Sequence, residues 1–284
     1  MVEFVERLAA HGWDSLKVTG LTLFMVMGPG MILALCMHGV STRVKSGAWA
    51  LLGPKLYLGL FGWLGICIHE LGHAIMCVIF GHRVETLRLF APDASTRTLG
   101  YVKHSFNPHN PYQVIGNFFI ALGPIILGTA VIWLAARYLL PRELVAHDLL
   151  WHWSNFQSPE AVWNLVMSTW DMCQAMFQEI FTFKNGNRWQ SWVFAYILVS
   201  VGSGISLSWE DISGGLEGFG VFFILAYIVV FAAGYFGGIP AHWINASSQA
   251  VGSFYPLLLF TMLLNGLLAI FITIMNLAAA SLKN

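Results

Sequence analysis

The run His69-Glu70-Leu71-Gly72-His73 combines two imidazoles and a carboxylate within five residues. On an α-helix, residues four apart share a face, so His69 and His73 can reach one metal ion. Glu70 would then lie close enough to hold and deprotonate a metal-bound water. The spacing therefore predicts a hydrolytic zinc centre, with the two histidines as Zn²⁺ ligands and Glu70 as the general base.

The sequence around this motif, GWLGICIHELGHAIMCVIFG, is otherwise apolar. A charged side chain at the centre of a bilayer costs about 2.5–3.5 kcal/mol on insertion scales, so ionisable residues there usually serve a function. The alternative is a polar cluster that forms hydrogen bonds with a neighbouring helix. Three ionisable residues within five favour the metal centre over this alternative.

The composition is that of a membrane protein. The chain has 284 residues, of which 57% are hydrophobic and 10% charged, with 14 Lys and Arg against 14 Asp and Glu. A soluble domain would have about 25% charged residues. The balanced charge offers no basic surface for nucleic acid, so we expect the lipid bilayer as a partner and no nucleic acid.

Six apolar stretches approach the roughly 20 residues that a spanning helix needs. They are 20–40, 56–80, 114–140, 192–207, 216–236 and 255–280. The fourth is short and interrupted by Gly202 and Gly204, so we expect it to end inside the protein. We predict an all-α polytopic membrane protein with about six transmembrane helices, folded as a single membrane-embedded domain over residues 1–284.

Two loops between these stretches have different patterns. Residues 82–112 alternate apolar and polar side chains among Pro, Gly and Asn, which predicts short strands or a hairpin. Residues 141–191 predict amphipathic helices along the membrane interface. The tryptophans of this second loop are Trp151, Trp153, Trp163, Trp170 and Trp189. Lys and Arg divide evenly between the two sides of a six-span topology, so the charge rule does not decide the orientation.

A catalytic zinc site also needs a third protein ligand. After Glu179 the only acidic residues are Glu210, Asp211 and Glu217, at the junction of the fourth and fifth stretches. We favour Asp211, with Glu210 and Glu217 as alternatives. Asp211 also fits a capping box with Ser208 at a helix start, and the two roles can coexist.

Loop histidines and the cysteines are weaker candidates for the third ligand. The histidines are His82, His104, His109 and His152, which we interpret as loop or interfacial residues. Cys77 falls on the same helix face as His73, and we interpret it as a packing residue. The four cysteines form no CxxC pair and indicate no disulfide framework.

These features together resemble the site-2 protease family of intramembrane zinc metalloproteases. The resemblance rests on the HELGH motif inside a spanning helix, the β-like loop after it, Ala121-Leu122-Gly123-Pro124 in the next span, and an acidic residue near a later span. It covers about residues 55–220. It implies that His69, His73 and Asp211 bind Zn²⁺ and that Glu70 is the base. The implied substrate is a membrane-spanning protein that is cut within the bilayer.

The resemblance also implies that the loop 82–112 and both termini face the cytosol, with the protein in the cell (inner) membrane. Two other functions stay open. One is a membrane protease related to the prenyl-protein endopeptidases, which would use a glutamate as the third ligand. The other is a non-catalytic scaffold or assembly subunit that retains the metal site. A metal transporter is disfavoured, because the spans offer few further ligands along a path. The oligomeric state is left open.

Overall fold

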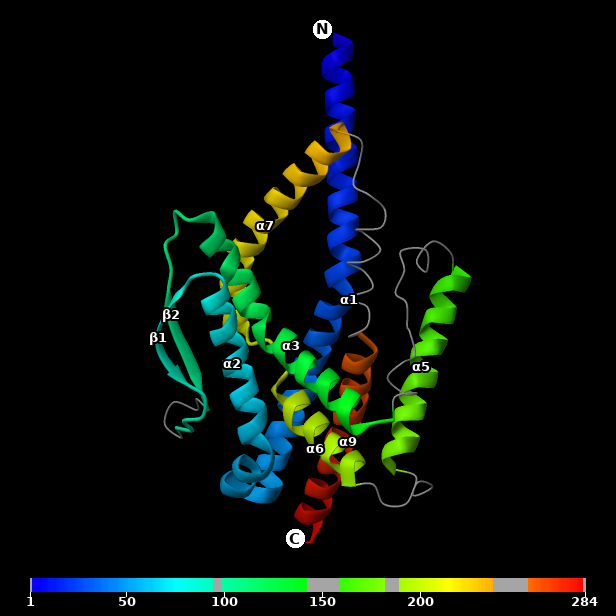
Figure 1. Ribbon diagram of the computed structural model, residues 1–284. Helices are drawn as coiled ribbons and strands as arrows, with labels where there is room; N and C mark the ends of the chain where they lie inside the picture. The colour runs from blue at the N-terminus through cyan, green and yellow to red at the C-terminus, as the bar shows by residue number, and fades with distance from the viewer. Residues whose placement is uncertain (1, 94–98, 142–158, 182–188, 237–254, 283–284) are drawn as a thin grey trace.

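The computed structural model describes residues 2–93, 99–141, 159–181, 189–236 and 255–282. Trp151, His152 and Trp153 lie outside this part of the chain. The elements, shown in Figure 1, are α1 (Val2–Tyr57), the short π-helix η1 (Leu58–Gly62), α2 (Trp63–Ile79), β1 (Arg83–Arg88), β2 (Tyr101–Ser105), α3 (Pro111–Leu139), α5 (Pro159–Phe181), α6 (Trp189–Gly204), α7 (Trp209–Tyr235) and α9 (Tyr255–Ser281).

Four helical segments of the described chain are long and apolar enough to cross a membrane: Val26–Ile79, Pro111–Leu139, Trp209–Tyr235 and Leu257–Ser281. The first contains two of the predicted spans, because the chain turns at Gly53 (φ 77°) just before Pro54. α6 has only 16 residues and ends at the buried Gly204, as expected for a helix that stops inside the protein. The predicted helical membrane architecture is therefore confirmed, whereas the count of six spans is not.

The part of α1 before Gly53 and α9 run in the same direction. Gly30 of α1 lies beside Tyr255 at the start of α9, and Gly47 lies beside Ile272 and Asn276 further along both helices. The start of α1 and the end of α9 consequently lie at opposite ends of the bundle (Figure 1). The expectation that both termini face the cytosol stays a prediction.

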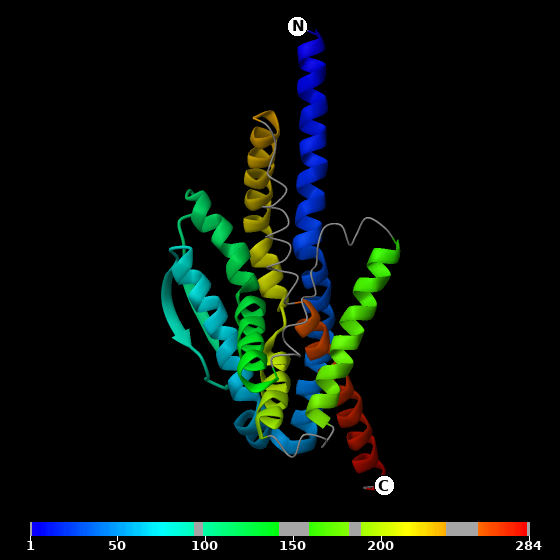
Figure 2. The ribbon, with the colours of Figure 1, turned by 45° about the vertical axis from the view of Figure 1, so that its right-hand side comes forward.

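Strands in the loop after α2 were predicted, and the structure confirms them. β1 and β2 form an antiparallel two-stranded sheet in which Val84 pairs with His104, with an irregularity between Val84 and Thr86. The hairpin runs back alongside α2 on the outer side of the bundle (Figures 1 and 2). The loop is thus brought next to the helix that carries the HELGH motif.

α5 is most of the described part of the loop 141–191, and it is amphipathic. The end of this loop, from Trp189, belongs to α6. Met172, Met176 and Ile180, one helical turn apart, are buried in the main hydrophobic core, whereas Trp163 is 63% exposed. This core also contains Phe194 of α6, so it lies between α5, α6 and their neighbours. Helical structure is confirmed here, and its position along the membrane interface stays a prediction.

Candidate metal centre

Glycines let α2 approach two neighbouring helices so closely that their backbones touch. A Cβ atom built on Gly72 would lie 2.6 Å from the carbonyl carbon of Gly123 in α3. A Cβ atom on Gly204 of α6 would lie 2.5 Å from the carbonyl oxygen of Gly65. Both distances are too short for any side chain, so glycine is required at these crossings. The crossings bring backbone carbonyls of α3 and α6 within reach of the HELGH motif.

Both histidines of the motif are oriented by these carbonyls. His69 Nδ1 donates a hydrogen bond of 2.9 Å to the carbonyl oxygen of Gly204. His73 Nδ1 donates one of 2.8 Å to the carbonyl oxygen of Ile120. Gly204 is the last residue of α6, where helix carbonyls lack intrahelical partners. The Ile120 carbonyl is available because Pro124, four residues later, has no N–H to donate to it.

This orientation leaves the two Nε2 atoms facing each other. A carbonyl oxygen can only accept, so Nδ1 carries the proton in both rings, and Nε2 carries a bare lone pair in each neutral imidazole. His69 Nε2 and His73 Nε2 lie 3.2 Å apart. Two lone pairs repel at this distance unless a proton or a metal cation lies between them. The pattern of side chains gave no indication of these backbone acceptors, although Pro124 was a signal for one of them.

Asp211 brings a carboxylate to the same point. Its Oδ1 lies 3.3 Å from His73 Nε2. Its Oδ2 accepts hydrogen bonds from the backbone N–H and the hydroxyl of Ser208, at 2.8 and 2.7 Å. The Ser208 hydroxyl in turn accepts from the Asp211 N–H, which completes the predicted capping box. One oxygen therefore caps α7 while the other faces the histidines.

Two glycines of α7 hold its first turns against α3. A Cβ atom on Gly218 would lie 2.5 Å from the carbonyl oxygen of Val114, and one on Gly215 would lie 3.0 Å from Cβ of Ala121. This close contact is what allows Asp211, 138 residues after His73 in the sequence, to reach the imidazoles. Four helices, α2, α3, α6 and α7, thus contribute to one cluster through glycine contacts.

The cluster has the dimensions and the chemistry of a zinc site. Zn–N and Zn–O bonds of about 2.0–2.2 Å in a tetrahedral arrangement place neighbouring ligand atoms about 3.3–3.4 Å apart. The contacts of His73 with His69 and Asp211, 3.2 and 3.3 Å, match this separation. Two imidazoles and one carboxylate leave a fourth position open, as catalytic zinc sites require. His69, His73 and Asp211 are therefore suited to hold Zn²⁺.

Glu70 lies beneath the end of the hairpin. Its side chain is buried, with 9% exposure. A Cβ atom on Gly100, just before β2, would lie 2.8 Å from Glu70 Cγ and 2.9 Å from the carbonyl oxygen of Arg88, where β1 ends. Glycine at position 100 thus lets the hairpin cover the Glu70 side chain.

The other predicted ligand candidates lie elsewhere. Glu210, Glu217 and His109 are exposed, and His152 lies outside the described residues. His82, His104 and Cys77 form a separate group of potential metal ligands. Of Glu210, Asp211 and Glu217, the three acidic candidates for the third ligand, the structure brings Asp211 to the two histidines.

The protonation of His104, in strand β2 of the hairpin, depends on its burial and on nearby charged groups. Burial lowers the pKa of His104 in β2 below its usual value of 6.5, and positive charge on His82 or His73 would lower it further. The carboxylate of Glu85 acts in the opposite direction. His104 therefore favours the neutral form, in which a ring nitrogen keeps its lone pair.

Comparison with known families is consistent with this geometry. Residues 44–151 match the family model described as Peptidase M50B-like. This match supports membership in the site-2 protease family. It covers α2, the hairpin and α3, and it ends before Asp211. No curated protein and no solved structure matches the chain. The match and the apolar helices together support an integral membrane protein with a peptidase-like segment.

Proposed function

We propose that the protein is an intramembrane zinc metalloprotease that hydrolyses a peptide bond of a membrane-spanning protein, and that it resides in the cell membrane. The observation that carries this proposal is the pair of Nε2 atoms of His69 and His73, 3.2 Å apart, with Asp211 Oδ1 3.3 Å from His73. Neither ring can satisfy the other, and a divalent cation would satisfy all three groups. The Peptidase M50B-like match supports the same chemistry.

The residues of the chain would divide the reaction among them. His69, His73 and Asp211 hold the ion, and a bound zinc ion would polarise a carbonyl group and lower the pKa of water. Glu70 accepts a proton from the attacking water on its carboxylate as the water oxygen bonds to the scissile carbonyl carbon. The same proton then passes to the amine nitrogen as the carbon–nitrogen bond breaks.

The hairpin supplies a surface for the substrate. A membrane-spanning helix must unwind locally before hydrolysis, because its carbonyls are hydrogen-bonded within the helix. In the described chain β1 and β2 pair only with each other, so each has an outer edge that can accept an extended strand. The end of this sheet at Arg88 and Gly100 lies against Glu70. An unwound substrate paired to an edge would therefore run toward the base.

The decisive variant is Glu70→Gln in the full-length protein, reconstituted with a membrane-spanning reporter substrate. The amide is close in size to the carboxylate but cannot accept the proton, so cleavage should fall by at least about 10²-fold while zinc content stays at the wild-type level. Glu210→Gln, at an exposed position of α7, is the matched control and should cleave normally. Cleavage by the Glu70→Gln protein at the wild-type rate would remove Glu70 from the mechanism.

Zinc analysis of ligand variants separates this proposal from its rivals. Asp211→Asn should lose zinc, whereas Glu217→Gln should retain it, because Glu217 is exposed and outside the cluster. The opposite result would favour the glutamate-dependent endopeptidases. Stoichiometric zinc in a wild-type protein that cleaves no membrane-spanning substrate would favour the non-catalytic scaffold.

A further inference from the structure

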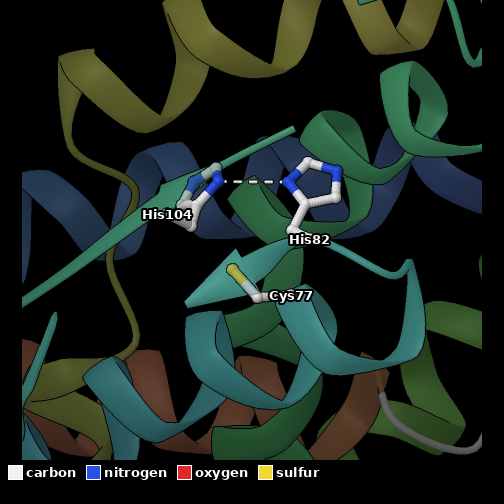
Figure 3. Close-up of side chains that lie close together, drawn as sticks. All are labelled: Cys77, His82 and His104. Atoms are coloured by element: carbon white, nitrogen blue, oxygen red, sulfur yellow. Dashed lines mark hydrogen bonds between the residues drawn. The ribbon is translucent and has the colours of Figure 1, made fainter. Parts of the chain in front are cut away.

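A second group of metal-ligand side chains lies where the end of α2 meets the base of the hairpin. Cys77, His82 and His104 each offer one ligand atom, and these atoms lie within 4.8 Å of one another. Cys77 is fully buried and His82 is 5% exposed. Figure 3 shows the two imidazoles facing each other, with the Cys77 side chain pointing from α2 toward them. The group contains none of the residues of the first cluster.

The local fold explains why these residues meet. Cys77 lies in the last turn of α2, and a tight turn through Gly81 (φ 70°) leads directly to His82. His104 is the cross-strand partner of Val84. Since side chains two apart in an extended segment point to the same side, His82 is a diagonal neighbour of His104. A residue from α2 and one from each side of the hairpin thus converge.

The His82 ring is fixed with a lone pair directed into the group. Its Nε2 donates a hydrogen bond of 2.7 Å to the carbonyl oxygen of Gln113, so the neutral ring has a bare Nδ1. Phe106 stacks on the ring, with centroids 5.1 Å apart and planes at 17°. His82 Nδ1 lies 3.0 Å from His104 Nδ1 (Figure 3). The carbonyl therefore acts on His82 as the carbonyls of Gly204 and Ile120 act on the histidines of the first cluster.

We propose that Cys77, His82 and His104 bind a second zinc ion, or an ion of similar softness. One thiolate and two imidazoles are ligands that Zn²⁺ prefers, and the open fourth position would be taken by water. Binding draws the sulfur toward the two nitrogens, because zinc ligands of this kind lie about 3.6 Å apart. The sequence alone favoured a packing role for Cys77, since it gave no indication that the hairpin returns to this helix face.

This second ion would clamp the hairpin to α2. Cys77 follows His73 by four residues, so the two sites are about 6 Å apart along the helix axis. The clamp holds the base of the hairpin, and the other end of the same hairpin covers Glu70 through Gly100. The second ion thus fixes the position of the sheet over Glu70. The inference does not depend on proteolysis, because it concerns metal binding alone.

Metal counting on the purified full-length protein tests the second site. The wild type should bind two equivalents of Zn²⁺, the double variant His69→Ala/His73→Ala one, and Cys77→Ser one. Cys173→Ser is the matched control, because Cys173 in α5 is also buried, at 4% exposure, but belongs to no such group among the described residues. The Cys173→Ser protein should bind two equivalents of Zn²⁺. A wild type with one equivalent, all of which is lost in the double variant, overturns the proposal.

Cobalt substitution identifies the ligand without relying on any variant. A cobalt–thiolate bond gives an intense charge-transfer band in the near ultraviolet, and the cluster of His69, His73 and Asp211 contains no sulfur. Wild-type protein loaded with two equivalents of Co²⁺ should show this band. The band should disappear in Cys77→Ser and persist in Cys67→Ser, which changes the cysteine nearest to Glu70 in the sequence.

The cobalt spectrum also covers the case in which a variant fails to fold. Elution as a single species in detergent shows which variants are folded. If the folded wild type shows no thiolate band with two equivalents of Co²⁺, the proposal is wrong, and His104 Nδ1 simply donates a hydrogen bond to His82 Nδ1. The same conclusion follows if the band persists in a folded Cys77→Ser protein.

Discussion

The contact between Gly72 and Gly123 gives the sharpest test of how the helices build the first metal centre. In Gly123→Ala the new Cβ atom would lie 2.5 Å from the carbonyl oxygen of Gly72 and 3.0 Å from the backbone nitrogen of His73. Carbon–oxygen contacts of this kind need about 3.3 Å, so α2 and α3 must separate by about 0.8 Å.

This separation acts directly on a zinc ligand. The hydrogen bond from His73 Nδ1 to the Ile120 carbonyl is 2.8 Å long and joins the same two helices. A shift of about 0.8 Å would lengthen it to about 3.6 Å, which is no longer a hydrogen bond. Loss of the group that orients a metal-bound histidine typically lowers metal affinity by about 10–100-fold. We expect Gly123→Ala to weaken zinc binding by this factor.

The assay is competition for zinc against a chromophoric chelator, together with cleavage of a membrane-spanning reporter. Gly220→Ala is the matched control, because this α7 glycine also lies inside a helix. Apart from its own helical turn, no atom of the described residues lies within 4 Å of the position that a Cβ would occupy. This variant should bind zinc and cleave as the wild type does. If folded Gly123→Ala protein binds zinc with wild-type affinity, the glycine crossing does not position His73 and the reasoning is refuted.

Three further perturbations address separate contacts. Pro124→Ala introduces an N–H that competes with His73 for the Ile120 carbonyl, so zinc affinity should fall by about tenfold in the same competition assay. An unchanged zinc affinity would show that the proline is not needed to keep this carbonyl available to His73. Ser208→Ala removes the helix cap and two hydrogen bonds to Asp211, and it should lower the free energy of unfolding by about 1 kcal/mol and zinc affinity by about tenfold, measured by thermal unfolding and chelator competition. Loss of stability without any change in zinc affinity would contradict the second half of that prediction. Finally, the metal-free protein should lose stability as the pH falls below 6.5, because the lowered pKa of His104 means that the unfolded chain binds more protons than the folded one. Thermal unfolding at a series of pH values should show this slope, and His104→Asn should reduce it; an unchanged slope in that variant would assign the effect to other groups.

The local patterns of the sequence predicted much of this structure. Apolar length predicted the helices, and the alternation in 82–112 predicted the hairpin, because both signals depend on neighbouring residues alone. The capping box at Ser208 and Asp211 is also a short-range pattern, and it is present as predicted. The spacing of His69 and His73 predicted that they share a helix face.

Long-range relations were harder to predict. The parallel arrangement of α1 and α9 depends on how helices far apart in the sequence pack together, which residue patterns did not determine. The backbone carbonyls of Gly204 and Ile120 are invisible to an analysis of side chains. The meeting of Cys77 with His82 and His104 depends on the hairpin folding back onto α2, and alternation predicts a strand without predicting what it packs against.

His69 and His73 are oriented by backbone carbonyls, and this affects which positions around the centre tolerate substitution. A carbonyl oxygen is supplied by whatever amino acid occupies the position, so residue 120 can change its side chain without disturbing the imidazole that depends on it. Substitution is instead restricted at the glycines of the helix crossings and at Pro124, which make those oxygens accessible to the imidazoles. At residue 120, substitution should therefore be limited by packing alone. Gly204 must stay glycine, because a Cβ atom there would lie 2.5 Å from the carbonyl oxygen of Gly65.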